Sequence, residues 1–115
     1  MCVKIINKKR FLTGSKDFDV KLWDVETGAC LRTYKGHNFG ICDIELSFDD
    51  KQFLTSSYDK TIKLWKIDES ECLYTLDAYS PVFCMALLDS DILYGGTNGG
   101  CIRVIHFILS LFNFK

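Results

Sequence analysis

A stretch of thirteen residues occurs twice in this chain, and this repeat constrains the fold more than any other feature of the sequence. The segment FLTGSKDFDVKLW at residues 11–23 returns as FLTSSYDKTIKLW at residues 53–65. A shift of 42 positions aligns residues 11–34 with 53–76, and eleven of the twenty-four aligned residues are identical. A weaker third copy occupies residues 93–107. A repeat at this period predicts copies of one supersecondary unit, stacked so that each covers the next.

Each unit is predicted to be a small antiparallel sheet. The second copy holds four β-branched or apolar segments separated by turn-forming residues, namely 41–48, 52–57, 61–67 and 72–76. In the third segment, Ile62 and Leu64 fall on one face of the strand. Trp65 and Ile67 fall on the other face, so the sheet must be covered on both sides. Four strands per unit, this period and two covered faces together predict blades of an all-β propeller.

The middle copy carries residues that resemble a WD40 repeat. The segment KGHNFGICDIELSFDDKQFLTSSYDKTIKLWKI has Gly36-His37 near its start and Leu64-Trp65 near its end. The first copy keeps the dipeptide that names the family as Trp23-Asp24, whereas the second has Trp65-Lys66 and the third Ile105-His106. The resemblance covers residues 1 to about 107. It implies WD40-type blades in an incomplete ring, because propellers close with about four to eight blades.

The resemblance also implies boundaries along the chain. They separate a first repeat truncated at its N-terminus, a complete second repeat, a degenerate third repeat and a divergent apolar tail, at residues 1–35, 36–77, 78–107 and 108–115. We therefore expect either a fragment of a larger propeller or a natural short form that completes a ring with other copies or another chain. In either case two blade faces are expected to be uncovered, with apolar residues such as Phe53, Leu64 and Phe107, and to promote self-association.

A buried hydrogen-bond network is the next implication of the resemblance. In WD40 blades a loop histidine, a serine or threonine on the second strand, an aspartate in the following turn and a tryptophan on the third strand are linked. The matching residues are His37, Ser57, Asp59 and Trp65 in the second copy, and Ser15, Asp17 and Trp23 in the first. Ser57 is expected to relay the hydrogen bond between His37 and Trp65. In the third copy Tyr79 stands at the histidine position, and Gly99 and Ile105 replace the aspartate and the tryptophan.

A histidine, a serine and an aspartate could also indicate nucleophilic hydrolysis. That chemistry needs an exposed nucleophile beside an oxyanion hole, whereas Ser57 is expected within a strand. We therefore predict a structural network and no enzyme, with no catalytic residues and no cofactor.

The six cysteines include no C-x-x-C pair and recur at equivalent repeat positions, which indicates packing groups and no metal site.

Composition limits the partners and the location of the chain. The formal net charge of -1 gives no basic surplus for nucleic acid. The apolar segment at residues 104–114 is shorter than the roughly 20 residues that span a bilayer, so no membrane association is expected. The N-terminus lacks the pattern of a secretory signal, which predicts reduced thiols and a cytoplasmic or nuclear protein that is not secreted.

Binding of protein or peptide partners is the function that the resemblance implies. The candidate binding face consists of residues next to the loop histidine and the turn aspartate: Lys16, Asn38, Gly40, Tyr58, Ser80 and Asn98. Tyr58 is the favoured anchor, although a tyrosine there could simply shield a turn. The alternative to a general scaffold is the substrate receptor of a ubiquitin ligase. Such receptors often carry a basic residue two places after the Trp-Asp aspartate, where this chain has Glu26 and Asp68.

Overall fold

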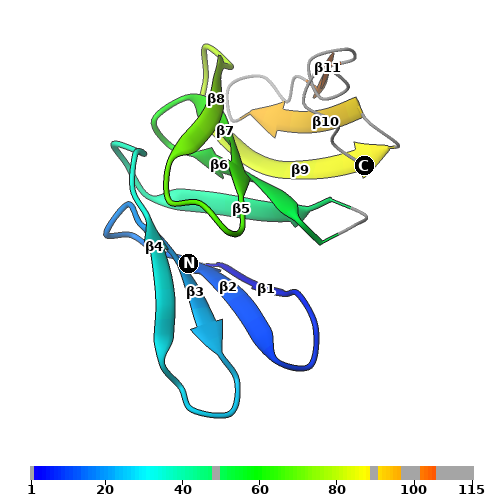
Figure 1. The fold of residues 1–115 in the computed structure, drawn as a ribbon. Coiled ribbons are helices and arrows are strands. Elements are labelled where there is room, and N and C mark those ends of the chain that lie inside the picture. Colours follow the sequence, from blue (N-terminus) through cyan, green and yellow to red (C-terminus); the bar gives the residue numbers. More distant parts are fainter. Residues whose placement is uncertain (1, 48–49, 89–90, 97–101, 106–115) are drawn as a thin grey trace.

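The computed structural model describes residues 2–47, 50–88, 91–96 and 102–105, and this part of the chain contains strands and no helix. The strands form three antiparallel sheets (Figure 1). Sheet A comprises β1 (Cys2–Ile5), β2 (Arg10–Gly14), β3 (Val20–Asp24) and β4 (Cys30–Tyr34). Sheet B comprises β5 (Ile41–Leu46), β6 (Gln52–Ser57), β7 (Thr61–Lys66) and β8 (Cys72–Asp77). Sheet C comprises β9 (Val82–Leu88), β10 (Asp91–Gly96) and β11 (Ile102–Ile105).

The repeat in the sequence is a repeat in the structure. In sheets A and B each strand pairs with the next one along the chain, so both sheets are meanders of four strands. Phe11 is opposite Trp23 in sheet A, and Phe53 is opposite Trp65 in sheet B. The two rings are stacked in each pair, with centroids 6.3 Å and 6.2 Å apart. The strands expected in the second copy are confirmed, except that β5 ends at Leu46, β7 ends at Lys66 and β8 continues to Asp77.

The larger apolar core lies between sheets A and B. Tyr34 at the end of β4 packs edge to face on Phe53, with ring centroids 4.8 Å apart, and its ring also meets Trp65. Its hydroxyl donates to the carbonyl oxygen of Ile67 at 2.5 Å. Burial raises the pKa of Tyr34 to about 12, so this hydroxyl stays protonated. Tyr34 of sheet A therefore packs in the apolar core and also donates a hydrogen bond to the carbonyl that follows β7 of sheet B.

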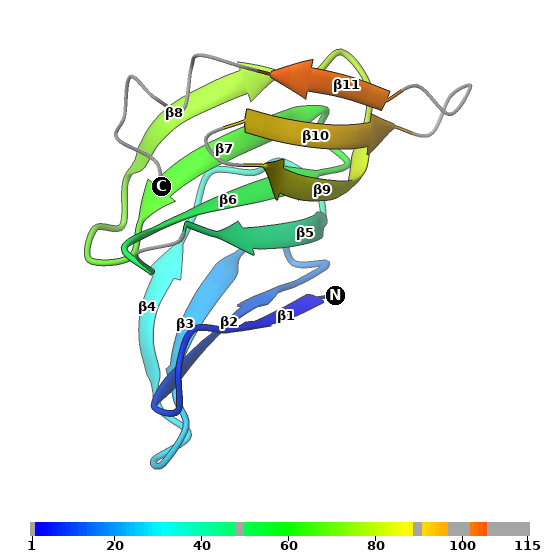
Figure 2. The same cartoon turned by 90° about the vertical axis from the view of Figure 1, so that its right-hand side faces the viewer.

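A second core joins sheet B to sheet C. Leu54, Ile62 and Leu64 on the other face of sheet B pack with Val82 and Met85 of β9. The prediction that both faces of this sheet are covered is confirmed. Figure 2 shows the three sheets following one another as successive blades. The sheets form an arc that does not close into a ring.

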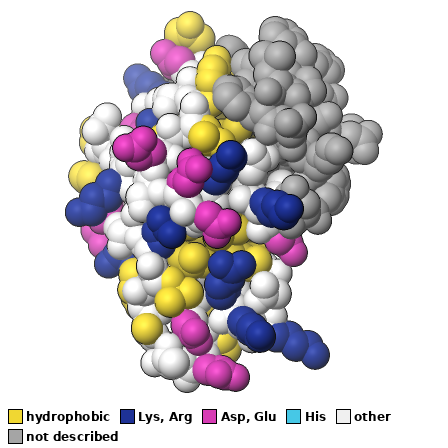
Figure 3. All heavy atoms as spheres, viewed as in Figure 1, with side chains coloured by type: hydrophobic (Ala, Val, Ile, Leu, Met, Phe, Trp, Pro, Cys, Tyr) yellow, Lys and Arg dark blue, Asp and Glu magenta, His cyan; other side chains and the backbone are white. Residues whose placement is uncertain are grey.

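Sheet A keeps one face uncovered among the described residues. Val3 and Ile5 on β1 are 62% and 72% exposed, and Phe11 and Trp23 are only half-buried. Their equivalents in sheet B, Phe53 and Trp65, are completely buried against sheet A. Figure 3 shows hydrophobic side chains among charged ones in the part of the view where sheet A lies. We call the surface formed by Val3, Ile5, Phe11 and Trp23 the open face of sheet A.

The expectation that Phe53 and Leu64 would be uncovered is wrong. Both side chains lie between sheets, where they are at most 2% exposed. They belong to the middle blade, which has a neighbour on each side, so the uncovered face belongs to sheet A instead. Phe107, the third residue of that expectation, lies outside the described residues.

The antiparallel order brings alternate loops together at one end of the sheets. The loops at residues 15–19, 35–40, 58–60 and 78–81 share one end, which we call the His37 end. Backbone hydrogen bonds tie these loops to one another, for example from Ile41 N to Ser15 O at 3.1 Å and from Ala78 N to Lys60 O at 2.8 Å. This end is where the expected site residues gather.

Candidate functional site

The buried centre of the site is the imidazole of His37. The loop at residues 35–40 carries it into the space beside β6. Its Nδ1 lies 2.8 Å from Oδ2 of Asp59, and its Nε2 lies 2.6 Å from Oγ1 of Thr55. The His37 side chain is 1% exposed and that of Asp59 is 5% exposed. Both ring nitrogens have partners, so the imidazole fastens the loop to sheet B.

Thr55 links the histidine to the tryptophan. The indole Nε1 of Trp65 donates to Oγ1 of Thr55 at 2.9 Å. Because that oxygen accepts the indole proton, the hydroxyl proton of Thr55 can be donated to Nε2 of His37. The single N–H proton of the neutral ring then lies on Nδ1 and is donated to Asp59. The chain of hydrogen bonds runs from Trp65 through Thr55 and His37 to Asp59.

The expectation that Ser57 relays this hydrogen bond is wrong. The Ser57 hydroxyl instead contacts the carbonyl oxygens of Phe39 and Gly40 at 3.0 and 2.9 Å, and it accepts from the backbone N of Asp59 at 3.1 Å. The reason is the strand register. Trp65 pairs with Phe53, so Thr55 is its diagonal neighbour on the same face. Ser57 is four positions from Phe53, about 13 Å farther along the strand.

Burial and hydrogen bonding set the charges in this network. Burial lowers the pKa of His37, against the opposing effect of Asp59. Burial alone would raise the pKa of Asp59, but hydrogen bonds from Thr61, from the backbone of Asn38 and from His37 outweigh it, and the pKa is lowered. The Thr61 hydroxyl donates to Oδ1 at 2.5 Å, and Asn38 N donates to Oδ2 at 3.0 Å. A neutral imidazole therefore faces an ionised carboxylate.

The network suits a structural joint better than a catalytic centre. A general base needs a ring nitrogen within reach of a substrate, and both nitrogens of His37 are engaged inside the protein. The Ser57 hydroxyl points to backbone carbonyls and not to His37. Within the described ranges, no group of three or more histidine, cysteine, aspartate or glutamate side chains is arranged to hold a metal ion.

Sheet A contains a partial copy of the same network. Trp23 Nε1 donates to Oγ1 of Thr13 at 2.8 Å, so Thr13 holds the place that was expected for Ser15. The hydroxyl of Ser15 accepts from the backbone N of Asp17 at 3.1 Å, as Ser57 does for Asp59. Asp17 is exposed, and hydrogen bonds from Ser15 and the Asp19 backbone lower its pKa.

The third copy is only partly described. Tyr79 occupies the loop between β8 and β9 and is exposed, so it does not take the buried position of His37. Ile105 ends β11, at the position that a tryptophan would occupy. Gly99 lies outside the described residues.

The residues of the expected binding face gather at the His37 end, apart from one that the structure does not describe. Lys16 and Asn38 are exposed, Tyr58 is 53% exposed, and Gly40 and Ser80 are half-buried. Asn98 lies outside the described residues. A Cβ atom on Gly40 would lie 3.6 Å from Cα of Lys16 and 3.7 Å from Cδ2 of Tyr58, so this glycine sits between the two turns.

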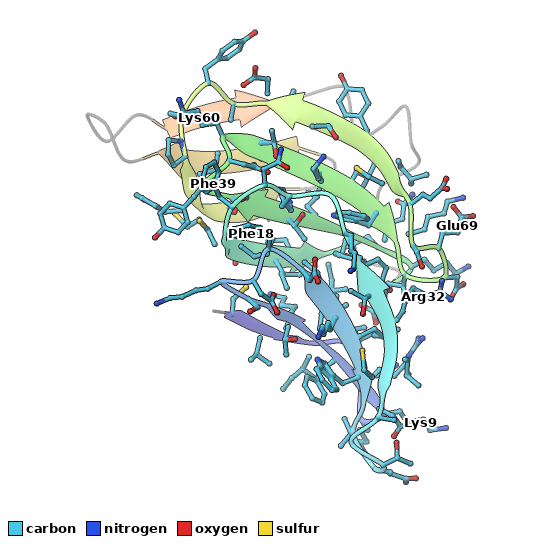
Figure 4. The ribbon with its side chains drawn as sticks, turned by 90° about the vertical axis from the view of Figure 1, so that its left-hand side faces the viewer. Lys9, Phe18, Arg32, Phe39, Lys60 and Glu69 are labelled. Carbon is cyan, nitrogen blue, oxygen red and sulfur yellow. The ribbon has the colours of Figure 1, made fainter. Side chains whose placement is uncertain are left out.

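Three aromatic residues at this end were missed by the sequence reasoning. Phe18 and Phe39 are exposed and pack against each other, and Phe83 packs against Tyr58. Figure 4 shows Phe18 and Phe39 at the same end of the sheets as Lys60, away from Lys9, Arg32 and Glu69. A count of aromatic residues in the expected loops could have found Phe18 and Phe39. Phe83 could not have been found in this way, because it lies on β9 outside those loops, at the irregular position of the ladder that Cys42 holds in β5.

The cysteines among the described residues are free thiols: Cys2, Cys30, Cys42, Cys72 and Cys84. Burial raises the pKa of Cys2, and it raises that of Cys42 to about 11. A raised pKa keeps a thiol protonated and weakly nucleophilic. No reactive thiolate is indicated at these two positions.

Comparison with known families matches this geometry. The family model described as WD domain, G-beta repeat matches residues 1–24 and 28–66, which is more than half of the chain. This chain belongs to the WD40 family. A solved structure of the WD40 beta propeller domain of Doa1 superposes on this WD40 chain with a TM-score of 0.82 and 22% identity, covering 90% of this chain and 35% of that one. That likeness shows the fold: the sheets of this chain are arranged as blades of a β-propeller.

Curated relatives match over shorter stretches. The nuclear distribution protein nudF 1 of Talaromyces marneffei is 42% identical over 48 residues, which are 41% of this WD40 chain and 10% of that protein. The nuclear distribution protein PAC1 of Fusarium vanettenii is 46% identical over 37 residues, 32% of this chain and 8% of that protein. The mitogen-activated protein kinase kinase kinase A of Dictyostelium discoideum is 47% identical over 34 residues, 30% and 4% respectively. The WD40 chain thus matches at most a tenth of these relatives.

The described part of this WD40 chain contains no helix that is long and apolar enough to cross a membrane. The apolar segment at residues 104–114 is described only at Val104 and Ile105, which belong to β11.

Proposed function

We propose that this WD40 chain is a non-catalytic protein-interaction scaffold that acts as part of a larger propeller and binds protein or peptide partners at the His37 end. The observation that carries the proposal is that a buried hydrogen-bond network at this end lies next to exposed side chains on the loops. His37, Asp59 and Thr55 form a buried, fully paired joint. Lys16, Asn38 and Tyr58 stand exposed on the loops beside it.

Rigid loops with exposed polar and aromatic groups are suited to recognition. The loops of the His37 end are tied by backbone hydrogen bonds between blades, so little conformational entropy is lost when a partner binds. Tyr58 offers a large ring with a hydroxyl, the kind of side chain that often anchors protein interfaces. The enclosed imidazole, with both ring nitrogens engaged inside the protein, supports a scaffold over an enzyme.

The open face of sheet A supports the proposal that this chain is part of a larger propeller. The equivalent face of sheet B is covered by Leu12, Leu22 and Tyr34, all from sheet A. A further blade that brings such groups would bury Phe11 and Trp23, whether it comes from the same polypeptide, a second copy or another chain.

A cytoplasmic or nuclear location is also part of this proposal and rests on the sequence alone. Glu26 and Asp68, both exposed, support a general scaffold over a ligase receptor.

Affinity capture with the purified chain as bait tests this proposal. Tyr58→Ala and Lys16→Ala should reduce capture of a bound protein, with hot-spot losses of about 2 kcal/mol for Tyr58. Tyr74→Ala on the outer strand β8 and Lys9→Ala at the opposite end are matched controls. If all four variants fold and retain every partner equally, the His37 end is not the binding face.

A further inference from the structure

The turn between β7 and β8 carries a serine that contacts an arginine of the neighbouring sheet. Ser70 is exposed, and its Oγ accepts a hydrogen bond from Nη1 of Arg32 on β4 at 3.2 Å. Residues 67–71 form this turn, at the end of the sheets opposite the His37 end. Figure 4 shows Arg32 and Glu69 on the same side of the molecule, away from Lys60. A hydroxyl of one blade is therefore held beside a cation of another.

Strand β4 fixes the position of this arginine relative to the turn. Tyr34 lies two residues after Arg32 on β4, and its hydroxyl donates to the carbonyl oxygen of Ile67, the first residue of the turn, at 2.5 Å. Burial has the largest effect on the pKa of Tyr34, and the charges of Arg32 and Arg10 act against it. A second guanidinium therefore lies within electrostatic range of this junction. Arg32 is only half-buried, and a guanidinium has more N–H donors than the single one that it gives to Ser70 among the described contacts.

Acidic residues flank the serine on both sides. They are Asp68, Glu69 and Glu71. All three are exposed, and none forms an ion pair with another described residue. The equivalent turn of sheet A, at residues 25–29, contains one acidic residue and has Gly28 at the position of Ser70. An exposed hydroxyl within an unpaired acidic segment suits an enzyme with a basic substrate site, because charge patterns of this kind determine which segments a kinase selects.

A phosphate on Ser70 would be attracted by Arg32 and repelled by the flanking carboxylates. At pH 7 it would carry a charge of about -1.5 to -2 and add strong acceptor oxygens. The guanidinium already lies at hydrogen-bond distance from the oxygen that would carry the phosphate, and it can pair with phosphate oxygens in bidentate fashion. The carboxylates are exposed, so water and salt screen their repulsion and their side chains can turn away. The contact with Arg32 should therefore dominate.

We propose that Ser70 is the phosphorylation site of a serine kinase that selects acidic segments, and that the phosphoserine binds Arg32 and fastens the turn of sheet B to β4 of sheet A. ATP supplies the phosphoryl group. A bond forms between Oγ of Ser70 and the γ-phosphorus, the bond from that phosphorus to the bridging oxygen of ADP breaks, and the hydroxyl proton passes to the base of the kinase. The site does not depend on the proposed function, because it lies at the opposite end of the blades.

Incubation of the purified chain with magnesium, ATP and a serine kinase that selects acidic segments tests the modification. Mass spectrometry of the digested chain should locate one phosphate on Ser70. Replacing Glu69 and Glu71 together with glutamine should slow this labelling about tenfold or more. A Ser70→Ala chain should remain unlabelled between β7 and β8. A wild-type chain without phosphate on Ser70 would overturn the assignment of the site.

A chain that carries phosphoserine at position 70 tests the contact with Arg32. It should melt about 2–5 °C higher than the unmodified chain. In an Arg32→Gln background only the repulsion remains, so the same phosphate should lower the melting temperature. Phosphothreonine at Thr27, in the equivalent turn of sheet A and without a guanidinium contact among the described residues, is the matched control and should give no rise. A phosphoserine chain that melts no higher than the unmodified one, or that shows the same shift in both backgrounds, would refute the contact.

Phosphorus NMR measures the same contact without a variant. The second ionisation of an unpaired phosphoserine occurs at about pH 6. A guanidinium partner favours the dianion, so the pKa of this phosphate should be lower in the folded chain than in the same chain unfolded in urea. The acidic neighbours in sequence are present in both states, so the difference reports the partner that folding supplies. An equal or higher pKa in the folded chain would contradict pairing with Arg32.

Discussion

Replacing Thr55 with valine removes one hydroxyl from the centre of the network and keeps the shape of the side chain. Two buried groups then lose their partner: the indole N–H of Trp65, at 2.9 Å from Oγ1, and Nε2 of His37, at 2.6 Å. Neither group can turn to water, because Trp65 is completely buried and the His37 side chain is 1% exposed. The perturbation therefore isolates the hydrogen bonds from the packing.

The expected cost follows from these two orphaned groups. A buried donor or acceptor without a partner costs about 1–3 kcal/mol, so the two together mean that Thr55→Val should lower the free energy of unfolding by about 2–6 kcal/mol. That is a large part of the roughly 5–15 kcal/mol that stabilises a typical domain. Urea unfolding followed by tryptophan fluorescence measures the change, provided that the slope of the transition stays the same.

Sheet A supplies a matched control for this measurement. Thr13→Val removes the partner of Trp23 Nε1, but Trp23 is half-buried and no described histidine shares the threonine. Water can replace that bond, so the loss should be about 1 kcal/mol or less. Ser57→Ala should also cost about 1 kcal/mol. A Thr55→Val chain that is no less stable than the Thr13→Val or Ser57→Ala chain would refute the assignment of Thr55 as the link.

Three further perturbations test other parts of the structure. Because burial lowers the pKa of His37 below 6.5, the unfolded chain binds the proton first as the pH falls; urea midpoints should decrease from about pH 6.5 downwards, and a His37→Gln chain should show a flatter profile. Gly14→Ala would place a Cβ atom 2.5 Å from Cγ2 of Ile41, so it should cost about 1–3 kcal/mol in the same unfolding assay. Tyr34→Phe should cost about 1–2 kcal/mol, measured by thermal melting, because the buried Ile67 carbonyl loses its donor. An unchanged midpoint in any of these would contradict the contact concerned.

The WD40 assignment and the strand layout could be predicted because they depend on local patterns. The period of the repeat defines the unit, and the two-residue alternation of a strand shows that β7 is covered on both faces. His37, Asp59 and Trp65 could be placed in one network because the resemblance to a WD40 repeat assigns each of them a position in the motif. None of these predictions requires knowledge of which residues are paired across neighbouring strands.

The choice between Thr55 and Ser57 needed the tertiary structure. Both residues lie on the same face of β6, so the alternation cannot separate them, and only the pairing of Phe53 with Trp65 brings Thr55 within reach of the indole. The uncovered face was likewise misassigned, because burial of Phe53 depends on Tyr34 of the neighbouring sheet. The sequence by itself determined the blade, through contacts between near neighbours along the chain. The packing of separate blades decided which side chains are enclosed and which stand exposed at the His37 end, since that depends on contacts between distant segments.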